Sequence, residues 1–312
     1  MLDAPGFRMG GIMVIITLEQ VSILLIFAVI GYLLCKKKLA NSGHAKLLST
    51  LEVYVFLPCK VFQTFSSKFT VNYIREKYYF IILSAVILLI VCVAAHFLAK
   101  LFSKKPYEQG VYTYSLVVPN YGYVGYALAE GLFGSEMLLN MMIFALPVML
   151  YTYTIGFSML TNRKFTWKKL LQPNVIAIAL GCVVGLTGMK IPGVAEAVIT
   201  KSAACMAPVS MILAGMTISE FQLKVLLMNV KYYAMTLLRL IVIPCALAFA
   251  VQQLVGPQEA LLTILLYAMP CGMNTIVFPK LVGENCEIGA GLAFISSILA
   301  CITIPICVGL FA

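Results

Sequence analysis

Two apolar segments of membrane-spanning length are each interrupted near the middle by proline, glycine and asparagine. The first interruption is Val118-Pro119-Asn120-Tyr121-Gly122-Tyr123-Val124-Gly125, and the second, 151 residues further on from Pro119 to Pro270, is Met269-Pro270-Cys271-Gly272-Met273-Asn274-Thr275. A proline inside a helix removes one backbone donor and clashes with the carbonyl four residues back. In hydrocarbon such breaks persist only where protein buries them or where they line a wet cavity. Paired breaks at matching places in two halves are typical of the binding site of a secondary transporter.

The composition predicts an all-α integral membrane protein. Hydrophobic residues make up 62% of the chain and charged residues only 11%, whereas soluble domains contain about 25% charged residues. A spanning helix needs about 20 mostly apolar residues. Ten such stretches are predicted, at 14–35, 45–66, 78–102, 110–133, 137–160, 172–189, 196–218, 228–254, 258–282 and 287–311. No room remains for a soluble catalytic or nucleic-acid-binding domain.

The positive charges predict the orientation, because Lys and Arg in short loops favour the cytoplasmic side. Loops after odd-numbered spans contain fourteen of them: Lys36, Lys37, Lys38, Lys46, Lys100, Lys104, Lys105, Arg163, Lys164, Lys168, Lys169, Lys224, Lys231 and Lys280. The opposite side contains five: Arg8, Lys68, Arg75, Lys77 and Lys190. We therefore expect a multi-pass protein of the cell membrane with both termini outside. Contact with anionic lipids explains the net charge of +10, so no nucleic-acid partner is expected.

Enzyme chemistry is not indicated. The ten cysteines occur singly, without a C-x-x-C pair, so neither the spacing of a disulfide framework nor that of a metal site is present. Buried free cysteines act as small apolar residues. We find no nucleophile motif and no cluster of metal ligands, and we expect no bound cofactor.

Landmarks recur between the two halves of the chain and predict an internal repeat. The equivalent pairs are Gly31 with Gly185, Pro58 with Pro208, Pro119 with Pro270, and Gly134 with Gly283. Each half then contains five spans, and an odd number of spans makes the repeat inverted. We predict a first five-helix repeat at 1–160, a cytoplasmic linker at 161–171 and a second repeat at 172–312. Inverted repeats place the binding site near the membrane midplane and support alternating access.

The interruptions in spans 4 and 9 have a chemistry that suits a small anion. The amide end of a half-helix carries about half a positive charge and can hold an anion without a basic residue. Asparagine amides both donate and accept, and glycines let the backbone approach a ligand closely. The predicted substrate-binding residues are Pro119, Asn120, Tyr121, Gly122, Gly125, Pro270, Gly272, Asn274 and Thr275. Tyr123 and Tyr126, with Tyr121, are expected to line a pocket.

Ordinary proline kinks are the alternative interpretation of these interruptions. Prolines also occur in spans 2, 5, 7, 8 and 10, at Pro58, Pro147, Pro208, Pro244 and Pro305. Only around Pro119 and Pro270 do proline, glycine and asparagine occur together within a few residues. This clustering favours a binding site.

Motifs along the whole chain resemble the auxin efflux carrier family, in its bacterial branch. They are Leu57-Pro58 with Val61-Phe62, Asn120-Tyr121-Gly122-Tyr123-Val124-Gly125 followed by Leu132-Phe133-Gly134, Pro173-Asn174-Val175-Ile176-Ala177 with Gly181, Leu213-Ala214-Gly215-Met216, and Ala268-Met269-Pro270 with Asn274. The resemblance implies a scaffold and a transport part whose two broken helices cross, and an anionic, often carboxylate, substrate such as malate or malonate. The long cytoplasmic loop of many plant relatives is missing, so auxin itself is not implied.

Ionisable residues inside spans are expensive and suggest function. Glu52 and Glu130 are the candidates for coupling transport to H⁺ or Na⁺. Lys201, Arg239 and His96 fit better with snorkelling or structural pairing. Carbonyl oxygens freed at the two breaks could also hold Na⁺.

We therefore predict a secondary active transporter that exports or exchanges a small organic anion. A channel or uniporter for a small solute is the alternative, and a membrane enzyme or receptor is disfavoured because no catalytic motif or signalling domain is recognised. A homodimer is compatible with the sequence.

Overall fold

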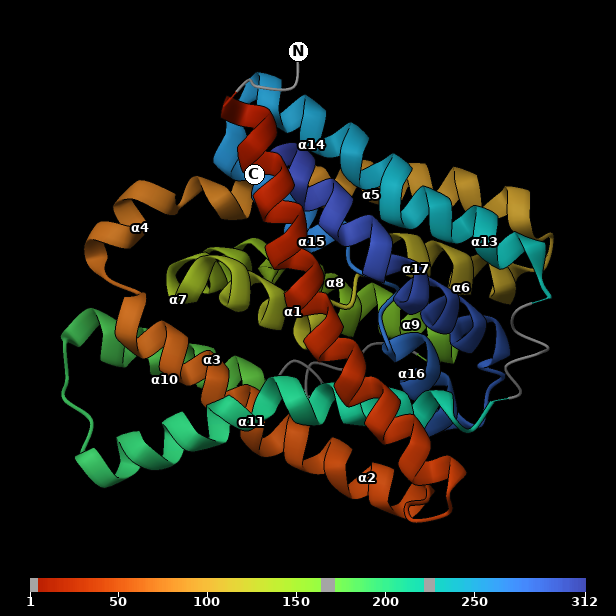
Figure 1. The fold of residues 1–312 in the computed structure, drawn as a ribbon, viewed down its shortest axis with the longest axis horizontal. Coiled ribbons are helices and arrows are strands. Elements are labelled where there is room, and N and C mark those ends of the chain that lie inside the picture. Colours follow the sequence, from red (N-terminus) through yellow and green to blue (C-terminus); the bar gives the residue numbers. More distant parts are fainter. Residues whose placement is uncertain (1–4, 164–171, 222–227) are drawn as a thin grey trace.

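The computed structural model describes residues 5–163, 172–221 and 228–312, and these contain helices and no β-strand. The helices are α1 Pro5–Lys36, α2 Ser42–Leu51, α3 Leu57–Lys68, α4 Val71–Lys77, α5 Tyr79–Phe102, α6 Pro106–Val117, α7 Tyr126–Phe144, α8 Leu146–Tyr151, α9 Phe157–Thr161, α10 Pro173–Thr187, α11 Gly193–Ile218, α13 Val230–Leu237, α14 Ile243–Leu254, α15 Pro257–Tyr267, α16 Asn274–Val282 and α17 Glu287–Phe311 (Figure 1). In the part of the chain that the structure describes, four π-helical turns lie between or before these helices: Glu52–Phe56, Tyr121–Gly125, Thr152–Gly156 and Leu238–Val242.

Helices occupy each of the ten predicted stretches. Within the described residues, six helical segments are long and apolar enough to cross a membrane: Gly11–Lys36, Tyr79–Phe102, Tyr121–Phe144, Gly193–Ile218, Val230–Leu254 and Glu287–Phe311. Leu146–Thr161 and Pro173–Thr187 are shorter apolar helices. Most of the predicted linker at 161–171 lies outside the described residues. The structure is thus that of an all-helical membrane protein, and the ten crossings remain a prediction.

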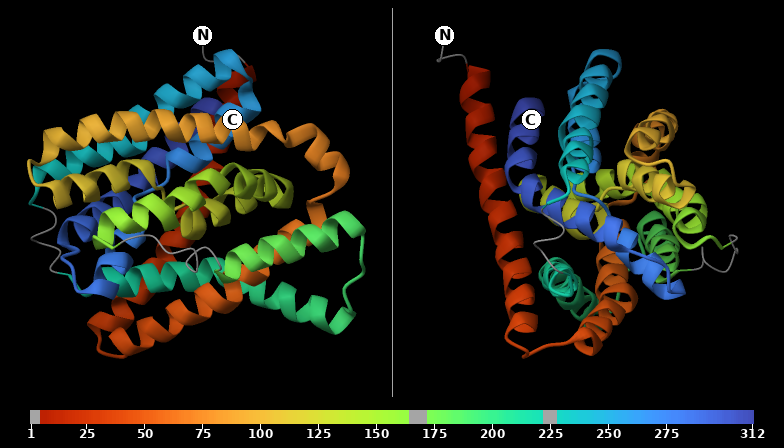
Figure 2. Two further views of the ribbon diagram at one scale, coloured as in Figure 1. Left: turned by 180° about the vertical axis from the view of Figure 1, so that it is seen from behind. Right: turned by 90° about the vertical axis from the view of Figure 1, so that its right-hand side faces the viewer.

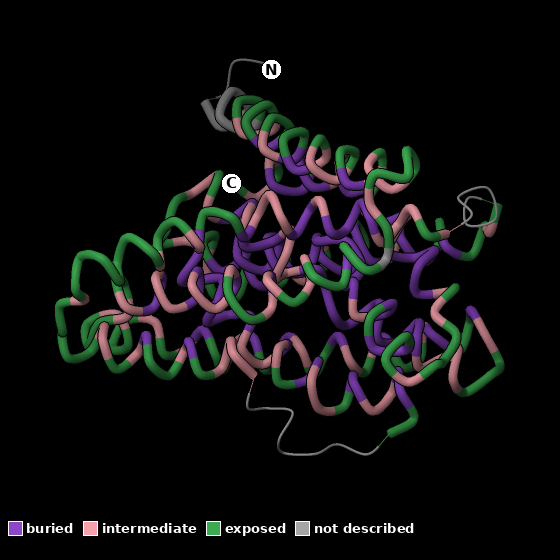
Figure 3. The backbone as a smooth tube through the Cα atoms, turned by 90° about the horizontal axis from the view of Figure 1, so that it is seen from below, coloured by how far each residue is buried: buried purple, intermediate pink, exposed green. Residues whose placement is uncertain are grey.

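The helices form two groups (Figures 1 and 2). The first, which we call the scaffold group, contains α1, α2, α3, α10 and α11, and its closest pairs are α1 with α11 and α3 with α10. The second, which we call the crossing group, contains α5 to α9 and α13 to α17. Buried residues concentrate inside the crossing group and along its contact with the scaffold group (Figure 3).

Glycines allow the scaffold helices to pack closely. A Cβ atom on Gly215 of α11 would lie 1.8 Å from the carbonyl oxygen of Ala28, and one on Gly31 of α1 would lie 2.0 Å from that of Ile212. On the other pair, a Cβ on Gly185 of α10 would lie 2.5 Å from the carbonyl oxygen of Phe69. Small residues at such crossings let helix backbones approach each other, as is common in membrane proteins.

Two of the other prolines change the local helix type. Pro58 and Pro244 each follow a π-helical turn and stand in the first turn of the next helix. Because proline frees the carbonyl four residues earlier, Pro244 leaves that of Leu240 without its usual donor. The thiol of Cys307 lies 3.7 Å from this oxygen and supplies a donor. Pro208 and Pro305 lie inside continuous helices. These four prolines therefore interrupt no helix with an unwound segment.

Candidate functional site

The two interruptions lie against each other. The amide of Asn120 donates to the carbonyl of Pro270 at 2.8 Å, and the amide of Gly272 donates to the carbonyl of Val118 at 3.2 Å. These bonds form a single antiparallel bridge between Pro119 and Cys271. Since each unwound segment satisfies backbone groups of the other, neither break leaves these groups exposed to hydrocarbon.

Four half-helices end or begin at this crossing. The carbonyl ends are those of α6, which ends at Val117, and α15, which ends at Tyr267. The amide ends are those of the turn that begins at Tyr121 and of α16, which begins at Asn274.

Each of the two outgoing half-helices leads to a glycine of positive φ. Gly134, inside α7, and Gly283, after α16, both adopt positive φ, at 79° and 77°. Glycine adopts this conformation without the steric penalty that a Cβ atom brings. The landmark pair of the sequence therefore marks a glycine of positive φ in each half, although ψ differs, at −174° for Gly134 and 17° for Gly283.

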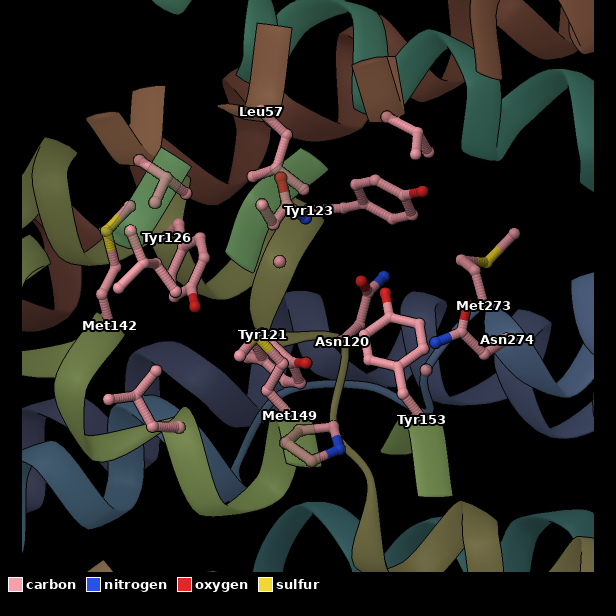
Figure 4. Close-up of a pocket in the computed structure, with 18 of the residues that line it drawn as sticks. Leu57, Asn120, Tyr121, Tyr123, Tyr126, Met142, Met149, Tyr153, Met273 and Asn274 are labelled. Carbon is pink, nitrogen blue, oxygen red and sulfur yellow. The ribbon is translucent and has the colours of Figure 1, made fainter. Parts of the chain in front are cut away.

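A cavity lies beside the crossing, between the scaffold and crossing groups. We call it the aromatic cavity, and it is lined by Val53, Leu57, Val61, Phe65, Pro119, Asn120, Tyr121, Gly122, Tyr123, Tyr126, Met142, Leu146, Met149, Tyr153, Asn174, Ile178, Gly272, Met273 and Asn274. Its volume is about 90 Å³, against the roughly 10–15 Å³ that one water needs. Figure 4 shows Asn120, Asn274 and Tyr153 around the same space, with Tyr121, Tyr123 and Tyr126 nearby.

Six of the nine predicted substrate-binding residues line this cavity, namely Pro119, Asn120, Tyr121, Gly122, Gly272 and Asn274. The other three have different surroundings. Gly125 leaves room for Met141 and Met269, Pro270 lines a second cavity on the other side of the crossing, and the buried hydroxyl of Thr275 donates to the carbonyl of Gly272 at 2.9 Å. These three residues shape the crossing without lining the aromatic cavity.

Several lining residues were not predicted as binding residues. Tyr153 comes from the π-helical turn Thr152–Gly156, Asn174 from the first turn of α10, and Met142 and Met149 from α7 and α8. Asn174 belongs to the Pro-Asn motif at the start of span 6, which was a usable signal. Nothing local in the sequence distinguishes Tyr153 from the other tyrosines.

The two candidate coupling residues have different partners. Glu52 is fully buried and accepts a hydrogen bond from Ser210 of α11, while its Oε2 atom has no partner. Glu130 of α7 forms an ion pair with Lys60 of α3. This pair joins the crossing group to the scaffold group and lines a polar vestibule of about 520 Å³ together with Lys190 and Glu196.

The ten cysteines are free thiols. Among the described residues, no group of three or more His, Cys, Asp or Glu side chains could hold a metal ion. No charged residue is among those that line the aromatic cavity. The arrangement offers backbone amides, side-chain amides and phenol hydroxyls as its polar groups.

A cavity at two crossed, interrupted helices within an apolar helical bundle is typical of membrane transporters. Residues 16–164 and 157–308 match the family described as Membrane transport protein. The chain belongs to this family, that of the auxin efflux carriers, which confirms the resemblance of its motifs. Over 305 residues it is 25% identical to an uncharacterized transporter of Methanocaldococcus jannaschii, covering 93% of this chain and 97% of that protein.

Proposed function

We propose that this membrane transporter is a secondary carrier for a small organic anion, of the carboxylate class, with its binding site in the aromatic cavity. The observation that supports this most directly is the bridge between Pro119 and Cys271. It brings two half-helix amide ends and the side chains of Asn120 and Asn274 to one cavity. A carboxylate can accept hydrogen bonds from these groups and interacts favourably with both helix dipoles.

Ten crossings in a 5+5 inverted repeat are part of this proposal. Contacts between distant loops support them, because partners fall on the same predicted face. Lys77 donates to Gln258 at 3.0 Å and Tyr79 donates to Glu259 at 2.6 Å, all at the predicted outer face.

Two further contacts lie at the predicted inner face. Lys280 pairs with Glu220, and the Tyr107 hydroxyl donates to the carbonyl of Asn285 at 3.0 Å. If the chain crossed the membrane one time more or one time fewer between the two partners of such a contact, the partners would lie on opposite faces and could not meet.

Alternating access would move the crossing group against the scaffold group. The aromatic cavity receives side chains from both groups, from α3 and α10 on one side and from the crossing on the other. The ion pair between Lys60 and Glu130 also joins the two groups. Relative movement would therefore open the cavity and break this pair together.

Glu52 is the stronger candidate for proton coupling. A buried carboxylate without a cationic partner is costly, and one oxygen of Glu52 has no hydrogen-bond partner. Its protonation can therefore respond to a nearby anion or to movement of α11, which contributes Ser210. Glu130 already has its counter-ion in Lys60. The alternative is coupling to Na⁺, which uptake that depends on Na⁺ and not on pH would indicate.

Uptake into proteoliposomes, measured with a panel of radiolabelled mono- and dicarboxylates, tests the proposal. Each lost hydrogen bond to a charged group costs about 1.5–3 kcal/mol, so Asn120→Ala or Asn274→Ala should reduce uptake roughly 10- to 100-fold. Asn140→Ala is the matched control. Asn140 is a buried asparagine that accepts a hydrogen bond from the Tyr73 hydroxyl, and neither residue lines the aromatic cavity. Normal uptake in both site variants would exclude the site.

The channel alternative is separated in the same vesicles. A carrier shows counterflow, in which unlabelled acid on one side drives labelled acid against its gradient, whereas a channel does not. Counterflow with saturation supports the carrier, and ionic conductance without counterflow supports a channel. Counterflow that is indifferent to pH and Na⁺ would indicate a uniporter.

A further inference from the structure

Arg239 is the largest fully buried side chain among the described residues. It lies in the π-helical turn Leu238–Val242, between α13 and α14. Burying a charge is expensive unless partners compensate it, and arginine keeps its charge in proteins. None of the ion pairs among the described residues includes Arg239. Its charge is compensated by something other than a carboxylate.

The guanidinium group lies at the carbonyl end of α6, beside the crossing of the two broken helices. Its Nη1 atom donates to the carbonyl of Leu116, in the last turn of α6, at 2.8 Å. Cys271, in the second interruption, reaches the same end of α6, since its thiol lies 3.7 Å from the carbonyl of Ser115. Four residues before Cys271, α15 ends at Tyr267. Each carbonyl end carries about half a negative charge, so together they can offset one positive charge.

Three other carbonyls near the end of α6 have uncharged donors. The amide of Val118 donates to Tyr114 at 2.8 Å, the thiol of Cys271 lies 3.7 Å from the carbonyl of Ser115, and the amide of Gly272 donates to Val118 at 3.2 Å. The hydrogen bond from Arg239 is thus the charged one in this set. The Nε and Nη2 atoms of Arg239 have no hydrogen-bond partner, which is more donor capacity than capping a single carbonyl requires.

We propose that Arg239 is a positioning residue that neutralises the carbonyl ends of α6 and α15 and so makes the crossing selective for anions. Without it, two negative and two positive half-helix ends would meet at one point, and their potentials would largely cancel. With it, the amide ends beside Asn120 and Asn274 dominate the potential in the aromatic cavity. This role deepens the proposed function, since it explains how a cavity without a basic side chain binds an anion.

A reporter thiol tests the potential without a substrate. Gly122 lines the cavity, and a Cβ atom there would meet nothing within 4 Å, so Gly122→Cys fits. The rate at which uncharged N-ethylmaleimide labels this thiol follows its thiolate fraction, and peptide mass spectrometry separates it from the ten native cysteines. Arg239→Met should slow this labelling about tenfold at neutral pH, as loss of a nearby buried charge implies.

Two matched variants separate charge from packing. Arg239→Lys keeps the charge and should label within about twofold of the unmodified reporter protein. Lys231→Met removes a cation that also donates to a helix-terminal carbonyl, that of Phe102 at 2.8 Å. Neither residue lines the aromatic cavity, so this variant should not change the labelling rate. Slower labelling in Arg239→Lys equal to that in Arg239→Met would assign a steric role and overturn the proposal.

Folding and function are kept apart by two further readouts. If Arg239→Met does not fold, the pH dependence of labelling is measured in the Gly122→Cys protein with Arg239 intact. The labelling rate must then reach half its maximum below about pH 8.5, the ordinary midpoint for a thiol. A higher midpoint overturns the proposal. Binding of carboxylates is measured separately, without the reporter. If carboxylates bind but Arg239→Met does not slow the labelling, only the role of Arg239 is contradicted. If Arg239→Met slows the labelling but no carboxylate binds, only the proposed substrate is contradicted.

Discussion

Two cavities flank the helix crossing, and their linings differ in chemistry. The aromatic cavity contains three asparagines and four tyrosines: Asn120, Asn174, Asn274, Tyr121, Tyr123, Tyr126 and Tyr153. The second, which we call the apolar cavity, has a volume of about 300 Å³ and is lined by α1, α11 and α17. Apart from Asn120, which reaches both cavities, its side chains with polar groups are Tyr32, Ser297 and Cys301.

The comparison separates what the backbone provides from what side chains add. In the proposed inverted repeat, α1, α11 and α17 are the counterparts of α10, α3 and the α8–α9 segment, so the two cavities occupy equivalent places. Both lie next to an interrupted helix, but the aromatic cavity is lined by seven asparagine and tyrosine side chains and the apolar cavity by two, Asn120 and Tyr32. We expect the substrate to occupy the aromatic cavity and the apolar cavity to remain free of it.

Filling each cavity in turn should give the largest contrast. Gly122→Leu places a side chain in the open space of the aromatic cavity and should reduce uptake at least about 100-fold, since overpacking and lost ligand space act together. Ala28→Leu projects into the apolar cavity and should change uptake less than about twofold. Initial rates of carboxylate uptake at equal protein levels in proteoliposomes measure both. Equal losses would show that the two cavities are not functionally distinct.

Removing one hydroxyl from each cavity is a finer comparison. Tyr153→Phe deletes a hydroxyl beside Asn120 and Asn274 (Figure 4), and a net hydrogen-bond loss of about 1 kcal/mol predicts a roughly fivefold weaker apparent affinity. Tyr32→Phe is the matched change in the apolar cavity and should have no effect on affinity. Concentration dependence of uptake gives the two values. A weaker affinity in Tyr32→Phe but not in Tyr153→Phe would place the substrate in the apolar cavity and contradict the proposed site.

The ion pair at the vestibule should have the smallest effect. The side chain of Glu130 is 37% exposed and that of Lys60 10%, so solvent screening limits the interaction. Glu130→Gln should lower the free energy of unfolding by no more than about 1 kcal/mol, and the difference should shrink as salt is added. Thermal unfolding of the purified protein in low and high salt measures this. A loss that salt does not change would argue against an electrostatic contribution.

The sequence predicted the helical segments and both interruptions because their signals are local. Apolar length determines where a membrane helix can lie, and the clustering of proline with glycine and asparagine marks where two of them unwind. The matching positive φ angles of Gly134 and Gly283 gave the landmark pair a physical meaning. The family assignment was likewise predicted from motifs and confirmed by the family match.

Side-chain partners were less predictable, because they depend on which helices pack together. Glu52 and Lys60 are about two helical turns apart in the sequence, yet they do not pair with each other. Glu52 accepts a hydrogen bond from Ser210, and Lys60 forms an ion pair with Glu130. Thr275 lies within the second interruption, but its hydroxyl satisfies the backbone. Arg239 was expected to be a structural or snorkelling residue, and only the tertiary structure places it at the carbonyl end of α6, beside the crossing.

The most direct test of the central claim is thermal unfolding of the purified protein in detergent with a panel of mono- and dicarboxylates, across pH and with or without Na⁺. A ligand that binds only the folded state raises apparent stability according to its occupancy. We predict that at least one acid stabilises the protein and that the Asn120→Ala, Asn274→Ala double variant loses this response while Asn140→Ala keeps it. A folded protein that no acid stabilises, or a response that survives in the double variant, would contradict the account.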